Sequence, residues 1–235
     1  MSIKLVLFDL DGTLLPMDQE VFIKHYFGGI SKYLSQFGYE PKKLIESIWL
    51  GTKDMINNDG SKTNEEAFWD RFKLIYGNDV MLDEPKFNDF YIKHFDEIKN
   101  SCGYDPNARE TILKIKDMGY EVLLATNPIF PSIATRKRIS WTGLDYDDFK
   151  LVTTYENSSY CKPNLKYYEE ILSKLGYQAN ECLMVGNDVA EDMIAAKLGM
   201  KVFLLPKCLI NKNNEDINKY PHGDFNDLLE FIKTL

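Results

Sequence analysis

The sequence has few residues of the kinds that build disulfide scaffolds or soft-metal sites. Its 235 residues include four cysteines, which are scattered and form no C-x-x-C pair, so neither a zinc knuckle nor a thioredoxin-type redox pair is indicated. Such cysteines are typical of reduced thiols in the cytosol. The three histidines are dispersed and form no H-x-x-x-H pair, so we interpret them as structural or surface residues.

Long apolar runs and an excess of positive charge are also absent from the sequence. No window approaches the roughly 18 consecutive apolar residues of a membrane span, and the apolar run before Asp9 is too short for the core of a signal peptide. The formal net charge of −8 disfavours sequence-independent binding to DNA or RNA. We therefore expect a cytoplasmic protein that binds neither a membrane nor a nucleic-acid polymer. No pattern indicates its oligomeric state.

Short apolar runs bounded by turn residues recur in the first 15 residues and again after about residue 100. Such runs are typical of strands that are buried on both faces. The segments between them have helical spacing, and three of these end at a glycine, which is a helix stop signal. This alternation predicts an α/β fold, a Rossmann-like parallel sheet with helices on both faces. The predicted strands are 5–8, 122–125, 151–154, 183–185 and 202–205, and the predicted helices are 107–118, 165–175, 191–198 and 225–233.

Residues 16–99 have a different texture. Aromatic and aliphatic residues recur there with helical spacing and without the short apolar runs, which predicts a bundle of helices inserted after the first strand. We therefore divide the chain into a core of residues 1–15 and 100–235 and an inserted helical domain of residues 16–99. Most aromatic residues of the insertion are expected to pack inside it. The candidates for contact with a substrate are Tyr26, Trp49, Thr52 and Lys53.

Two carboxylates follow the first predicted strand, in the segment Asp9-Leu10-Asp11-Gly12-Thr13. Because side chains alternate along a strand, Asp9 and Asp11 would point the same way if the strand continued. Ligands of open parallel sheets bind beyond the carboxyl ends of the strands. Two carboxylates there are costly unless a cation neutralises them, and Mg²⁺ with its oxygen ligands is the natural cation. The simpler alternative is an acidic turn that caps a helix.

Polar residues with possible roles at a phosphate site follow later strands. Thr126 and Asn127 offer a hydroxyl and an amide to phosphate oxygens, or else cap a helix. Lys162 offers a compact positive charge, unless it is one more surface lysine. Asp188 and Asp192 are four residues apart and share a face if a helix has begun there. The alternative is an acid-rich helix start, which is itself favourable.

Taken in this order, these residues resemble the haloacid dehalogenase superfamily of phosphatases and phosphotransferases. The segment 9–13 matches the first motif, Thr126 the second, Lys162 the third and the segment 186–192 the fourth. The resemblance extends along the whole predicted core. It also implies that residues 16–99 form a helical cap of the type inserted directly after the first motif.

The resemblance implies a Mg²⁺-dependent phosphatase that acts on a small phosphorylated metabolite. Asp9 would attack phosphorus and form an aspartyl-phosphate, while Asp11 would protonate the leaving oxygen and later take a proton from water. Thr126, Asn127 and Lys162 would bind the other phosphate oxygens.

The metal ligands implied by the resemblance are Asp9, the backbone carbonyl of Asp11, and Asp188. Most relatives carry an aspartate directly after the glycine of the fourth motif, where this chain has Asn187. Asp188 is the preferred ligand, because a carboxylate neutralises Mg²⁺ better than an amide, and Asn187 is the other candidate. Asp192 would orient Lys162 or a metal-bound water.

Other activities of related chemistry stay open at this point. Asp11 favours phosphoryl transfer over dehalogenation, because a departing chloride needs no proton. A phosphomutase would use the same core residues. A receiver-like signalling domain would use a similar acidic site, but it would be shorter and would lack a large insertion. A binding module that has kept only the fold would not need the complete set of motif residues.

Overall fold

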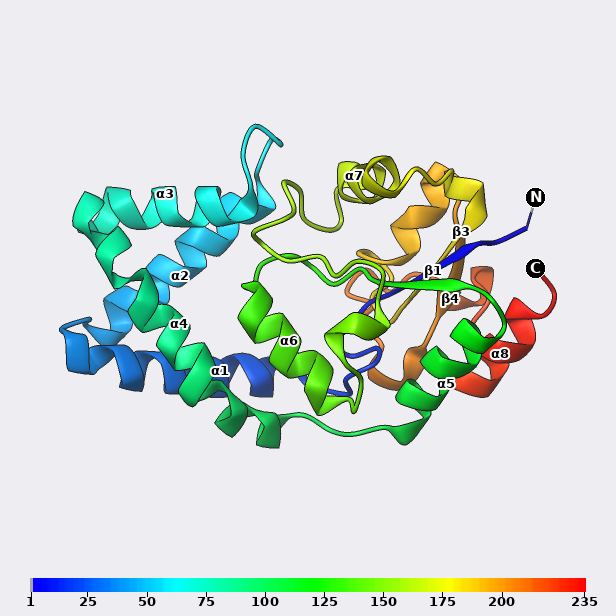
Figure 1. Cartoon of the computed structure of the whole chain (residues 1–235), viewed down its shortest axis with the longest axis horizontal. Helices are drawn as coiled ribbons and strands as arrows, with labels where there is room; N and C mark the ends of the chain where they lie inside the picture. The colour runs from blue at the N-terminus through cyan, green and yellow to red at the C-terminus, as the bar shows by residue number, and fades with distance from the viewer. Residues whose placement is uncertain (1) are drawn as a thin grey trace.

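The computed structural model of the protein describes residues 2–235 and contains a four-stranded parallel sheet with strand order β2-β1-β3-β4 (Figure 1). The strands are β1 (Leu5–Phe8), β2 (Glu121–Leu124), β3 (Cys182–Gly186) and β4 (Lys201–Leu204). Because β1 pairs with both β2 and β3, the carboxyl ends of these three strands meet at one edge of the sheet. The predicted parallel sheet is confirmed.

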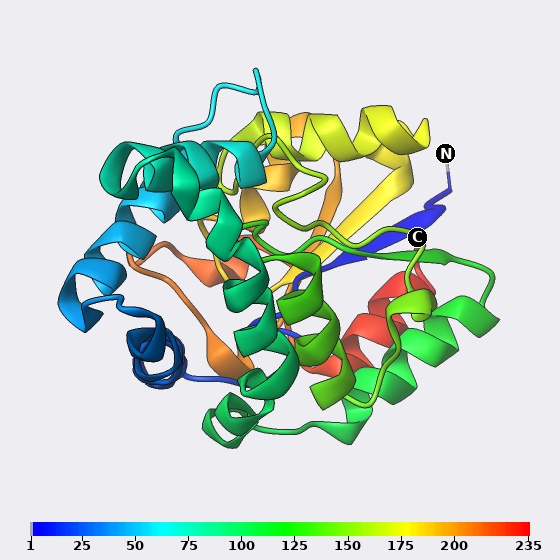
Figure 2. The same cartoon turned by 60° about the vertical axis from the view of Figure 1, so that its left-hand side comes forward.

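Alternate side chains of the strands enter two separate hydrophobic cores. Val6 and Phe8 of β1 belong to the core that α5 (Pro106–Asp117) and α8 (Phe225–Ile232) cover. Leu5 and Leu7 belong to the core that α7 (Leu165–Leu175) and the 3-10 helix η6 (Met193–Leu198) cover. The apolar side chains of each strand are therefore buried on both faces, which explains the continuous apolar runs. Helices lie on both sides of the sheet, as predicted (Figures 1 and 2).

The predicted strand 151–154 is wrong in extent. The segment follows the edge of β2 through backbone hydrogen bonds, but only Val152 forms a bridge, with Leu124. The hydroxyl of Thr153 donates to the backbone carbonyl of Thr126 at 2.7 Å. This local bond fastens Thr153 to the loop that leaves β2, so the ladder stops after one bridge.

The predicted helix 191–198 is also shorter than expected. Residues 188–192 form a turn, and the 3-10 helix η6 begins only at Met193. A carboxylate oxygen of Asp192 accepts a hydrogen bond from the backbone N–H of Asp188 at 3.0 Å, which closes the turn. Asp188 and Asp192 are therefore brought together by a turn rather than by the face of a helix.

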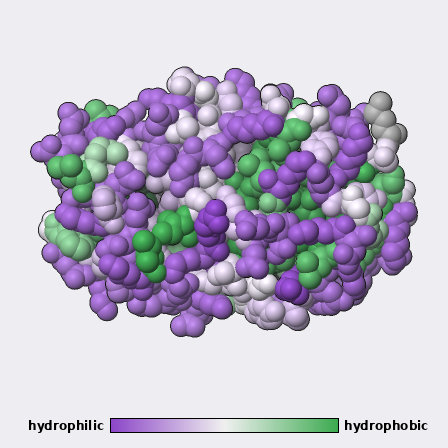
Figure 3. Space-filling view, viewed as in Figure 1, coloured by the Kyte–Doolittle hydropathy of each residue, from purple (hydrophilic) through white to green (hydrophobic). Residues whose placement is uncertain are grey.

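Residues 16–99 fold into helices that pack beside one another, away from α5 and α8 (Figures 1 and 2). Capping side chains fix where they start: Asp18 caps the first helix, and Thr63 and Glu66 form a capping box at the third. Hydrophilic residues cover most of the face seen in Figure 3. These helices are α1 (Gln19–Leu34), α2 (Pro41–Ile56), α3 (Asn64–Tyr76) and α4 (Glu84–Lys93).

The remaining elements connect the insertion to the sheet. The helix α6 (Ser132–Trp141) follows β2 and packs against α4 and η3. Within residues 2–235, no helix combines the length and the apolar character needed to cross a membrane. The other 3-10 helices are η1 (Ser35–Phe37), η2 (Asn78–Asp83), η3 (Phe95–Ser101), η4 (Tyr146–Asp148), η5 (Ala179–Glu181), η7 (Pro206–Cys208) and η8 (Ile217–Lys219).

Candidate active site

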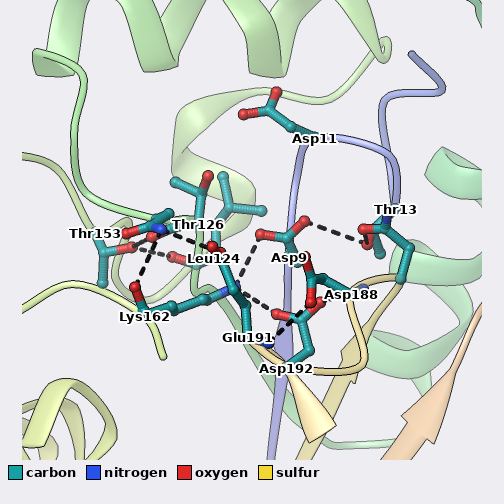
Figure 4. Close-up of polar contacts among 12 residues, drawn as sticks. Asp9, Asp11, Thr13, Leu124, Thr126, Thr153, Lys162, Asp188, Glu191 and Asp192 are labelled. Carbon is teal, nitrogen blue, oxygen red and sulfur yellow. Dashed lines mark hydrogen bonds and ion pairs between the residues drawn. The ribbon is translucent and has the colours of Figure 1, made fainter. Parts of the chain in front are cut away.

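Asp9 lies directly after β1, at the centre of the sheet's carboxyl edge. Its backbone N–H donates to the carbonyl of Val185 in β3 at 2.9 Å, which continues the pairing of the strands by one residue. Its carboxylate accepts from the Lys162 Nζ at 2.9 Å and, more weakly, from the Thr13 hydroxyl at 3.3 Å (Figure 4). The most central carboxylate of the site is thus held from two sides.

Lys162 joins Asp9 to Asp192. Its Nζ donates to Asp192 Oδ1 at 2.6 Å, and the side chains of both residues are only 1% exposed. Burial alone would lower the pKa of Lys162, but Asp192 and Asp9 together raise it well above its ordinary value. Lys162 is therefore a buried ammonium ion that stays charged because two carboxylates face it.

The loop after β2 brings Thr126 and Asn127 to the same cavity as Asp9. The backbone carbonyl of Thr126 accepts hydrogen bonds from the hydroxyls of Thr153, at 2.7 Å, and Tyr167, at 3.0 Å. These two bonds hold the loop in place. The amide of Asn127 donates to Glu191 at 3.0 Å, whereas its Oδ1 is buried without a partner in the described part of the chain. Both residues therefore line the same cavity as Asp9.

Asn187 and Asp188 have different surroundings. Asn187 is 1% exposed; its Oδ1 accepts from the Thr13 hydroxyl at 2.9 Å, and its Nδ2 donates to the Cys208 carbonyl at 2.6 Å. Asp188 lies beside Asp9 in Figure 4 and lines the cavity. Its Oδ1 accepts from the backbone N–H groups of Ala190 and Glu191. Both residues line the cavity, but the amide of Asn187 is occupied in joining two loops.

Two glycines allow these loops to approach so closely. A Cβ added to Gly12, which has a φ of +91°, would lie 2.4 Å from Nδ2 of Asn187. A Cβ on Gly186 would lie 2.0 Å from a carboxylate oxygen of Asp192. Both contacts are far below van der Waals distance, so any side chain at either position would push the acidic loops apart.

Asp11 does not point the same way as Asp9, contrary to the expectation from strand alternation. The strand ends at Phe8, and the backbone turns through hydrogen bonds that join Leu15 to Leu10 and Gly12. The carboxylate of Asp11 is turned away from the other acidic groups (Figure 4). It forms an ion pair with Arg138 of α6. Burial raises the pKa of Asp11, and Arg138 only partly offsets this effect.

The cavity nevertheless collects an excess of acidic groups. The acidic residues that line it are Asp9, Asp11, Asp188, Glu191 and Asp192. Lys162 forms ion pairs with two of them, Asp9 and Asp192. Burial raises the pKa of Glu191 and of Asp192 to about 7, against the opposing effect of Lys162. A surplus of carboxylates in a buried site is the arrangement that a cation stabilises.

The carboxylates of this cavity fit Mg²⁺ if they supply only a few of its ligands. Among residues 2–235, no group of three or more His, Cys, Asp or Glu side chains is arranged to hold a metal ion. Mg²⁺, however, commonly takes one or two carboxylates and completes its shell with other oxygens. Asp9 and Asp188 supply two carboxylates on one cavity, so the residues present fit the metal.

Residues 3–199, which make up most of the chain, match the family of haloacid dehalogenase-like hydrolases. The chain belongs to this hydrolase family. The resemblance read from the motifs is thereby confirmed, as is the assignment to an enzyme class. The match gives no support to the receiver-like alternative.

Two similar proteins are glyceraldehyde 3-phosphate phosphatases from archaea. The protein from Methanocaldococcus jannaschii is 25% identical over 99% of this chain and 98% of its own length. The protein from Methanothermobacter thermautotrophicus is 28% identical, over 48% of this chain and only 50% of its own length. Among solved structures, 2-haloacid dehalogenase from Pseudomonas syringae has a TM-score of 0.65 at 18% identity and covers 99% of each chain. That likeness shows a shared fold only.

Sequence reasoning about this hydrolase missed Arg138, and it gave no individual role to Thr13 and Glu191, which lie inside the first and fourth motifs. A signal existed for Arg138, because it lies four residues from Ala134 and three from Thr135, on the buried face of α6. A charged residue at such a position needs a buried partner. The contacts of Glu191 and Thr13 depend on how loops from distant parts of the chain meet.

Proposed function

We propose that this hydrolase is a Mg²⁺-dependent phosphatase that cleaves a small-molecule phosphate monoester through an aspartyl-phosphate at Asp9. One observation carries the proposal: Asp9 sits at the centre of the sheet's carboxyl edge, bonded to Lys162, in a cavity that Thr126 and Asp188 also line. A nucleophile that is bonded to a buried cation thus shares one cavity with a threonine hydroxyl, and a phosphate group can sit there.

In the first step, the Asp9 carboxylate attacks phosphorus and the bond from phosphorus to the ester oxygen breaks. The departing oxygen keeps the electron pair and takes a proton from Asp11. Lys162, Thr126 and Asn127 hold the remaining phosphate oxygens and stabilise the charge that develops on them. Asp192 is a positioning residue, because its 2.6 Å bond to Lys162 fixes the ammonium group.

In the second step, water attacks the phosphorus of the aspartyl-phosphate and transfers a proton to Asp11. The bond from phosphorus to the Asp9 oxygen breaks, so phosphate is released and the Asp9 carboxylate is restored. Asp11 must turn from Arg138 toward Asp9 to take part in either step, because its carboxylate faces away from Asp9 in Figure 4. Its buried position, which raises its pKa, favours the protonated form that the first step requires.

Asp9, the backbone carbonyl of Asp11, and Asp188 would hold Mg²⁺. When bound, the metal neutralises the carboxylates and lets an anionic nucleophile approach an anionic phosphate. Asn187 has the different task of joining the segment after β1 to the segment after β3, through its bonds to Thr13 and Cys208.

Residues 16–99 would act as the cap of the enzyme, and residues 1–15 and 100–235 as its core. A cavity of about 220 Å³ supports this division, because Asp9 and Asn187 of the core line it together with Trp49 and Thr52 of the insertion. The cap would exclude water from the reaction and select the substrate.

Phosphate release from a panel of phosphate monoesters, with glyceraldehyde 3-phosphate among the first, tests the proposal. Asp9→Asn should abolish turnover while leaving the thermal unfolding transition in place, and Asp89→Asn, an exposed change on α4, serves as the control. A single turnover in water labelled with heavy oxygen should place the label in the released phosphate. Turnover by Asp9→Asn at the wild-type rate would refute the assignment. Phosphorus NMR of the products distinguishes hydrolysis from transfer to a second hydroxyl.

A further inference from the structure

A second cavity extends from the site into the helical insertion. It has a volume of about 100 Å³ and lies next to the 220 Å³ cavity that contains Asp9. The two cavities share five lining residues, which are Ile23, Trp49, Thr52, Ile129 and Phe130. The two cavities therefore adjoin, and the second lies on the side of the first that the insertion covers.

The loop after β2 links the two cavities within the chain. Thr126 and Asn127 line the first cavity, while Ile129 and Phe130, only three residues further on, line both. The backbone N–H of Ile129 donates to the carbonyl of Asn127 at 2.9 Å, which makes this a tight turn. The wall of the second cavity is thus fixed to the phosphate-binding loop itself.

The wall of the second cavity carries no charged residue. Apart from Thr52 and Asn88, every lining residue is aliphatic, aromatic or proline. The hydroxyls of Tyr26 and Tyr91 bond each other at 2.9 Å, so that neither tyrosine needs a polar group from a ligand. This contrasts with the first cavity, which five acidic residues line.

We propose, on the basis of the function proposed above, that this second cavity takes the alcohol part of the substrate. The substrate is then a phosphate monoester of a short apolar alcohol rather than of a sugar or a nucleoside. An apolar cavity of about 150 Å³ accommodates benzene, so 100 Å³ suits roughly four carbon atoms. A sugar would bury several hydroxyls against a wall whose polar groups are mainly those of Thr52, Asn88, Tyr155 and the Trp69 indole N–H.

A series of unbranched alkyl phosphates from methyl to hexyl tests the proposal. With Mg²⁺ present, kcat/KM should rise about fourfold for each added methylene up to about butyl, as expected for burial of apolar surface, and should fall for longer chains. Butyl phosphate should also exceed glyceraldehyde 3-phosphate and glycerol phosphate. A flat series, or a preference for the polar esters, would overturn the proposal.

Variants of two cavity residues on α2 should move the optimum in opposite directions. Thr52→Leu fills part of the space and should shift the preferred chain to a shorter one, whereas Trp49→Ala opens the wall and should extend it. Leu50→Ala is the matched control, because Leu50 is an exposed neighbour on the same helix that lines neither cavity. An optimum that stays unchanged in both cavity variants would contradict the proposal.

Two further measurements separate this proposal from the function on which it rests. If methyl phosphate is hydrolysed in an Asp9-dependent way but chain length has no effect, the phosphatase assignment stands and the cavity proposal fails. Calorimetric binding of methyl- and butylphosphonate needs no turnover. The butyl compound should bind tens of times more tightly than the methyl compound, and equal affinities would refute the role of the cavity whether or not the chain is a phosphatase.

Discussion

The carboxylate of Asp11 is paired with the guanidinium of Arg138, a side chain from α6 that is 1% exposed. The guanidinium also donates to the hydroxyl of Thr135 at 3.3 Å and lies 4.5 Å from the ring centroid of Phe130. One oxygen of Asp11 and Nε of Arg138 are buried without partners in the described residues. The pair is therefore incompletely satisfied, which suits the turn of Asp11 toward Asp9 that the proposed mechanism requires.

Removal of Arg138 should destabilise the protein strongly. Arg138→Met leaves the partly buried carboxylate of Asp11 without a counter-ion, and breaking a buried pair typically costs about 3–5 kcal/mol. Asp11→Asn leaves the buried guanidinium unpaired and should also be costly. The double variant should lose much less free energy of unfolding than the sum of the two single losses. Urea denaturation of the four proteins measures this coupling, and additive losses would show that the pair does not stabilise the fold.

Lys162 should be needed for both activity and stability. Lys162→Met removes the cation between Asp9 and Asp192, so two buried carboxylates then face each other. We expect phosphate release to fall by about 10²–10³-fold, the usual effect of losing one group that stabilises transition-state charge. Lys166→Met is the control, because Lys166 is exposed in the first turn of α7. Equal activity of the two variants would mean that Lys162 has a structural role only.

The motif positions could be predicted from the sequence because the topology of a parallel sheet brings them together. Asp9 follows β1, and the fourth motif follows β3, which pairs with β1. Once the short apolar runs are recognised as neighbouring strands, the side chains at their ends must meet at one edge. The contact of Lys162 with both Asp9 and Asp192 agrees with that expectation.

The direction of Asp11 could not be predicted in the same way. It depends on where β1 ends and on an arginine that comes 127 residues later in the chain. Strand alternation holds only while the strand continues, and here the backbone turns directly after Asp9. The bridge at Val152 illustrates the same limit, because a side-chain hydrogen bond from Thr153 decides where pairing stops.

Asp188 and Asn187 should respond differently to mutation. Asp188→Asn removes a carboxylate that faces the cavity, so the Mg²⁺ concentration for half-maximal activity should rise by more than about tenfold, since outer partners alone account for 10–100-fold. Asn187→Ala breaks the bonds to Thr13 and Cys208 and should mainly lower the free energy of unfolding.

A titration of activity with Mg²⁺ after treatment with a chelator measures the metal requirement of both variants and of the wild type. The wild-type protein should be inactive after treatment with the chelator and should regain activity when Mg²⁺ is added. Magnesium binding measured by calorimetry without substrate provides a second readout. If Asn187→Ala weakens Mg²⁺ binding more than Asp188→Asn does, then Asn187 is the metal ligand and Asp188 is not.

Asp105 should make the stability of the protein depend on pH. It caps α5 by accepting from the Asn107 N–H at 3.0 Å, and it pairs with Lys207 at 2.9 Å. Burial alone would raise the pKa of Asp105, but Lys207 and Asn107 lower it below its ordinary value of about 4. The folded state then binds fewer protons than the unfolded state, so this contribution is complete above pH 4 and is lost as pH falls through the folded-state pKa.

Asp105→Asn keeps a capping side chain but removes the charge, so it isolates this contribution. The variant should lose about 0.5 kcal/mol at pH 7, because Lys207 is largely exposed and pairs of this kind are weak. The difference from the wild type should shrink as the pH is lowered toward 3. Asp105→Ala should lose about 1 kcal/mol more, because it removes the cap as well. Urea denaturation across this pH range measures all three proteins, and a wild-type advantage that stays constant with pH would show that the charge of Asp105 does not stabilise the fold.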